Sequence, residues 1–133
     1  MGAWSANSFG NDDALDWLAD LSDGKDDLIL ETLNKVAQLP PTEYLEAPEC
    51  CQALAAAELV AAASGAPPVE EFPEEATAWL SSHQLVVDSK LLDAVRQCIA
   101  RISTNSELRE LWDESDSKQE WYQSVEDLKK RIG

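Results

Sequence analysis

An alanine-rich run near the middle of the chain constrains the fold more than any other feature. Residues 47–65 have the sequence APECCQALAAAELVAAASG. The alanine content strongly favours a helix, Pro48 suits a first helical turn, and Gly65 with Pro67 after it is typical of a helix end. Because this helix is apolar on nearly every side, it must be buried on most of its faces. The chain therefore needs further helices to surround it.

Apolar residues at helical spacing predict such helices on both sides of the alanine-rich run. Before it lie DALDWLADL, which Asn11 can cap, and DLILETLNKVAQL. After it come EEATAWLSSH, SKLLDAVRQCIARIST, ELRELWDE with Ser106 as a cap, and WYQSVEDLKKRI, preceded by a possible Ser117–Glu120 capping box. No alternating run is longer than QLVVD. We predict an all-α fold in which residues 1–133 form one domain, a compact bundle of about six or seven short helices around the central one.

The distribution of charge limits the kinds of partner. The chain has 26 acidic and 10 basic residues, which gives a net charge of −16. Residues 1–89 contain only two of the bases, Lys25 and Lys35. Direct binding to nucleic acid is disfavoured, because a protein must supply cations to displace phosphate counterions. We expect an acidic patch formed by the first two helices and the loop around residues 70–75, and we take it as the candidate partner surface.

The sequence contains few residues of the types that usually carry out catalysis. His83 is the single histidine, and the three cysteines, Cys50, Cys51 and Cys98, are expected to be small apolar core residues in a reducing compartment. No phosphate-binding glycine motif and no C-x-x-C pair occurs. We therefore predict no cofactor. No apolar run approaches the length needed to span a bilayer, so we predict no membrane segment.

Carboxylates are the remaining candidates for chemistry. Asp16, Glu46, Glu49 and Glu58 could together form an oxygen-rich Mg²⁺ site, since hard cations prefer such ligands. The alternative is that they are solvated or helix-capping groups, which a chain with 26 acids has at many spacings by chance. Pro48 lies between Glu46 and Glu49, so these two straddle a helix start.

Glu58 stands apart from the other carboxylates because four apolar residues flank it on each side. In a central helix its side chain would be buried and would need hydrogen-bonding or charged partners. We predict that the loop of residues 1–10 packs on the core through Trp4 and Phe9, and that Glu58 accepts hydrogen bonds from this segment or from a side chain such as Trp4 or Tyr44. Trp17, on the apolar stripe of the first helix, is predicted to be a core residue.

The sequence resembles the bacterial family named domain of unknown function 4259 (DUF4259). The resemblance rests on the opening Met-Gly-Ala-Trp, on Phe9, and on the segments NDDALDWLADL, YLEAPE, ALAAAELVAA, LLDAV and SELRELWDES. The family typically continues its opening as Trp-Gly-Thr-Gly-x-Phe, and Ser5 and Asn7 stand at the two glycine positions here. The resemblance implies a small, single-domain, cytoplasmic bacterial protein and implies no activity.

Two hypotheses of function are consistent with the sequence. The first is a non-catalytic acidic helical module that binds a basic protein as an inhibitor, an immunity-type protein or a regulatory protein, since complementary charge steers association. The second is a carboxylate-metal-dependent hydrolase of a small phosphorylated substrate. Because no catalytic motif is present, we expect a binding protein rather than an enzyme.

Overall fold

Helix α3 (Ala47–Ala63) lies at the centre of the fold, as the sequence predicts. A computed structural model of the chain describes residues 12–24, 27–66, 73–83 and 85–132. In it α3 contacts each of the other six helices. Pro48 stands in its first turn, and Gly65 follows its end with a φ of +98°, a conformation that glycine adopts at little cost. The alanine side chains let neighbouring helices pack closely on every face of α3.

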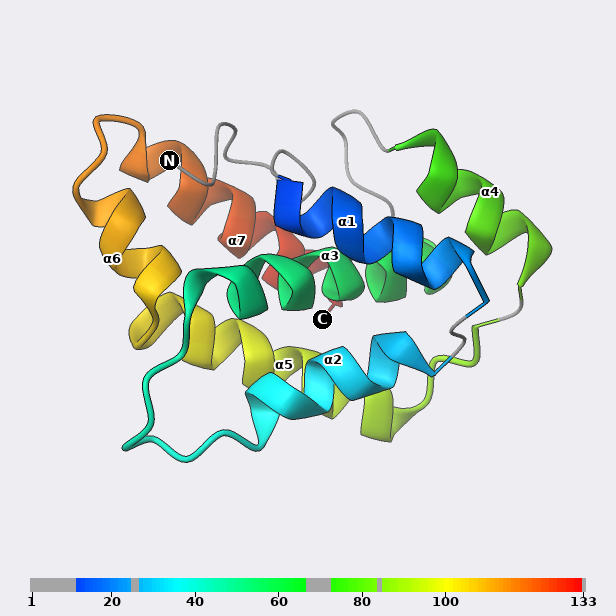
Figure 1. The fold of residues 1–133 in the computed structure, drawn as a ribbon, viewed down its shortest axis with the longest axis horizontal. Coiled ribbons are helices and arrows are strands. Elements are labelled where there is room, and N and C mark those ends of the chain that lie inside the picture. Colours follow the sequence, from blue (N-terminus) through cyan, green and yellow to red (C-terminus); the bar gives the residue numbers. More distant parts are fainter. Residues whose placement is uncertain (1–11, 25–26, 67–72, 84, 133) are drawn as a thin grey trace.

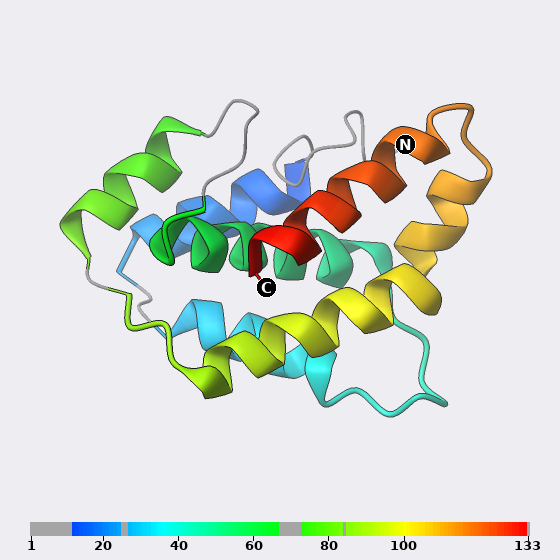
Figure 2. The ribbon, with the colours of Figure 1, turned by 180° about the vertical axis from the view of Figure 1, so that it is seen from behind.

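The described residues form seven helices, which confirms the all-α prediction. Six of them surround α3, and their bounds are α1 (Asp12–Ser22), α2 (Leu28–Ala37), α4 (Glu74–Ser82), α5 (Ser89–Thr104), α6 (Glu107–Asp113) and α7 (Lys118–Ile132). Figure 1 shows α1 and α4 along one side of α3, and α2 and α5 along the other. Seen from behind in Figure 2, α7 crosses in front of α3. None of the described helices has the length and apolar character needed to cross a membrane.

Helix starts agree with the sequence in some places and differ in others. The Ser106 hydroxyl accepts a hydrogen bond from the Arg109 amide and caps α6, as predicted. The Ser117–Glu120 capping box does not form, because the Glu120 amide donates instead to the backbone carbonyl of Ser117. A side chain of another helix caps the start of α3: the Ala47 amide donates to a carboxylate oxygen of Glu107, on α6, at 2.7 Å. Tertiary contacts thus replace local caps at some helix ends.

One side chain, that of Arg101, makes several of the hydrogen bonds that hold the segment between α2 and α3. The guanidinium of Arg101, on α5, donates to the backbone carbonyls of Leu39 and Pro40, each at 3.2 Å, and also to that of Glu43. Its Nε donates to the carbonyl of Asn105 at the end of α5. A planar group with five donors can satisfy several carbonyls at once, which a lysine cannot do in the same geometry.

We expect Arg101→Ala to lower the free energy of unfolding by about 1–3 kcal/mol, because several carbonyls lose a charged donor. Arg101→Lys should recover only part of this loss. The measurement is urea unfolding followed by circular dichroism. Lys90→Ala is a matched control on the same helix, since Lys90 is exposed and makes no hydrogen bond or ion pair with the described residues. Equal losses in Arg101→Ala and Lys90→Ala would contradict this role of Arg101.

Candidate functional site

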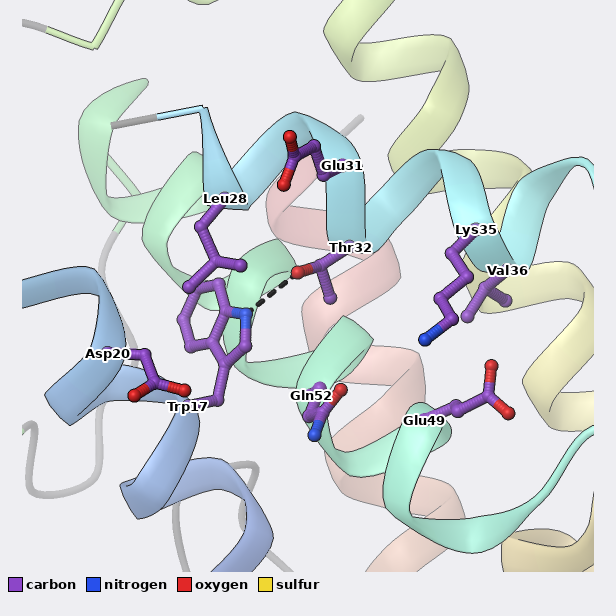
Figure 3. A pocket seen from close by; sticks show the side chains of 9 residues that line it. All are labelled: Trp17, Asp20, Leu28, Glu31, Thr32, Lys35, Val36, Glu49 and Gln52. Carbon is purple, nitrogen blue, oxygen red and sulfur yellow. Dashed lines mark hydrogen bonds between the residues drawn. The ribbon is translucent and has the colours of Figure 1, made fainter. Parts of the chain in front are cut away.

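A groove of about 210 Å³ lies where α1, α2 and α3 meet. Figure 3 shows it from close by, with the side chains that line it. They are Trp17 and Asp20 on α1, Leu28, Glu31, Thr32, Lys35 and Val36 on α2, and Glu49 and Gln52 on α3. The indole nitrogen of Trp17 donates to the Thr32 hydroxyl oxygen at 2.8 Å. This bond joins two buried side chains and fixes α1 to α2 beside the groove, and Trp17 is a core residue as predicted.

Five polar side chains of the groove have no partners within the described part of the chain. Asp20, Glu31 and Lys35 are exposed, and Glu49 and Gln52 are half-buried. None of the five forms a side-chain hydrogen bond or an ion pair with another described residue. Unpaired polar groups that converge on one concave surface are typical of a binding site. The groove therefore has the form of a site for a polar ligand.

Negative charge dominates this side of the molecule. Among the described residues, α1 and α2 with their flanking turns carry seven carboxylates and one ammonium group, that of Lys35. Three carboxylates line the groove itself, those of Asp20, Glu31 and Glu49. Negative charge along a concave surface attracts a cationic group and repels an anionic one. The groove is suited to a cationic group, and its lining contains no histidine or cysteine.

The candidate metal ligands do not come together. Asp16 is exposed on α1, whereas Glu46 and Glu49 stand at the start of α3. Glu49 and Glu58 are nine residues apart on that helix, a rise of about 13 Å, so they cannot bind the same ion. In the parts of the chain that the structure describes, no three His, Cys, Asp or Glu side chains form a group that could hold a metal ion.

Glu58 forms a buried ion pair with the last helix. Its side chain is buried, as predicted, with a residue exposure of 3%. The two carboxylate oxygens accept from Nη1 and Nη2 of Arg131 at 2.7 and 3.1 Å. Nε of Arg131 donates to Asp127 at 2.8 Å, and Nη1 also lies 3.4 Å from the Ala66 carbonyl. Burial lowers the pKa of the Arg131 guanidinium, but the Glu58 and Asp127 carboxylates outweigh it and raise that pKa above its usual value.

One protein-family model matches most of the chain. The model described as a domain of unknown function (DUF4259) matches residues 2–124. The chain belongs to the DUF4259 family. No curated protein and no solved structure matches it. The span that matches the DUF4259 model includes the whole groove and Glu58, but it ends before Asp127 and Arg131.

One predicted partner of Glu58 in this DUF4259 protein, Tyr44, is wrong. The hydroxyl of Tyr44 donates to Glu110 at 3.0 Å, not to Glu58. Trp4, Phe9 and Asn11 lie outside the described residues, as does the loop of residues 1–10 expected to pack on the core. Arg131 is not among the partners that the sequence predicts for Glu58.

One signal in the sequence could have identified Arg131. The buried stripe of α7 contains Trp121, Val125, Leu128 and Ile132. Arg131 lies three residues after Leu128, which places it beside this stripe rather than on the opposite face. A buried carboxylate needs a cation, and a base beside an apolar stripe can supply one.

Proposed function

We propose that this DUF4259 protein is a non-catalytic acidic helical module that binds a basic protein, as an inhibitor, an immunity-type protein or a regulatory protein. The observation that carries the proposal is the groove, which is lined by one lysine and by three carboxylates that have no partner among the described residues. Charge complementarity of this kind accelerates encounter with a cationic partner and opposes acidic ones. The net charge of −16 acts against nucleic acid as the ligand.

The proposal includes the cytoplasm of a bacterial cell as the place of action. All three cysteines are buried free thiols, and none of them is paired in a disulfide. Unpaired thiols are usual in reducing compartments, whereas small secreted domains are often stabilised by disulfides. The thiols therefore support this location.

A capture experiment from the source cells tests the proposal. The bait is the wild-type protein or a variant with Asp20→Asn, Glu31→Gln and Glu49→Gln, and the captured proteins are identified by mass spectrometry. We expect the wild type to retain a basic protein and the variant to lose it. Because exposed charges are screened over about 10 Å at 0.1 M salt, retention should fall several-fold between about 50 and 200 mM salt.

A control must distinguish the effect of net charge on binding from the effect of the groove carboxylates. The control bait carries Glu114→Gln, Asp116→Asn and Glu126→Gln, three exposed positions outside the groove, and so has the same net charge as the groove variant. It should still retain the basic protein. If no basic protein is captured, or if salt leaves its retention unchanged, recognition of a basic partner by charge is wrong.

A further inference from the structure

We draw no further inference here: the strongest candidate, the groove of about 170 Å³ between α5 and α7 where Arg96 and Lys129 border the apolar side chains of Ile99 and Ile132, carries none, because Arg96 already pairs with Asp93 and nothing in the structure shows what covers the groove.

Discussion

Glu58→Ala is expected to lower the free energy of unfolding by about 3–5 kcal/mol, the usual cost of removing one member of a buried ion pair. The guanidinium of Arg131 would lose both of its bonds to Glu58 while its side chain stays only 13% exposed. Urea unfolding followed by tryptophan fluorescence measures the change. Glu58→Gln should cost less, since an amide oxygen can still accept one of the two bonds.

Two further variants separate the ion pair from simple loss of side-chain volume. Asp127 also pairs with Arg131, but its side chain is 47% exposed, so Asp127→Ala should cost about 1 kcal/mol or less. The double variant Glu58→Met with Arg131→Met should be more stable than either single Met variant, because no uncompensated charge is left buried. If the double variant instead showed the summed losses of the two single variants, the pair would not be the source of the effect.

Stability is also expected to fall steeply at alkaline pH, because three thiols are buried in the core. Burial raises the pKa of Cys50 to about 11 and those of Cys51 and Cys98 to about 12, against an ordinary value of 9.0. The folded protein therefore holds these protons more tightly than the unfolded chain does. Their contribution is complete below pH 9 and is lost as the pH rises through the folded-state values.

The difference between the folded and unfolded pKa values sets the size of the expected loss in free energy of unfolding. At pH 10 each thiol accounts for a loss of about 1.4 kcal/mol, and the three together for about 4 kcal/mol. Urea unfolding at pH 8 and at pH 10, in the presence of a phosphine reductant, measures the difference. Alanine at all three cysteine positions should remove most of it, even though that variant is less stable at pH 8. An equal loss between pH 8 and pH 10 in the variant would assign the alkaline transition to other groups.

The sequence could predict the central helix, the helices around it and the burial of Glu58, because the signals for these features are local. The all-round apolar character of residues 47–63, Pro48 and Gly65 specify a buried helix and its ends without reference to any other segment. The stripes of the other helices are equally local, since side chains three and four residues apart share a face. The burial of Glu58 follows from its apolar neighbours alone.

What the sequence could not predict depends on how distant helices meet. Arg131 is 73 residues from Glu58, and Arg101 is about 60 residues from the carbonyls of Leu39, Pro40 and Glu43. Helical periodicity shows that a residue faces inward but not which residue on another helix it meets, since this depends on how the helices cross and shift along one another. For the same reason the sequence indicated acidic helices, whereas only their packing on α3 brought Asp20, Glu31 and Glu49 to one groove.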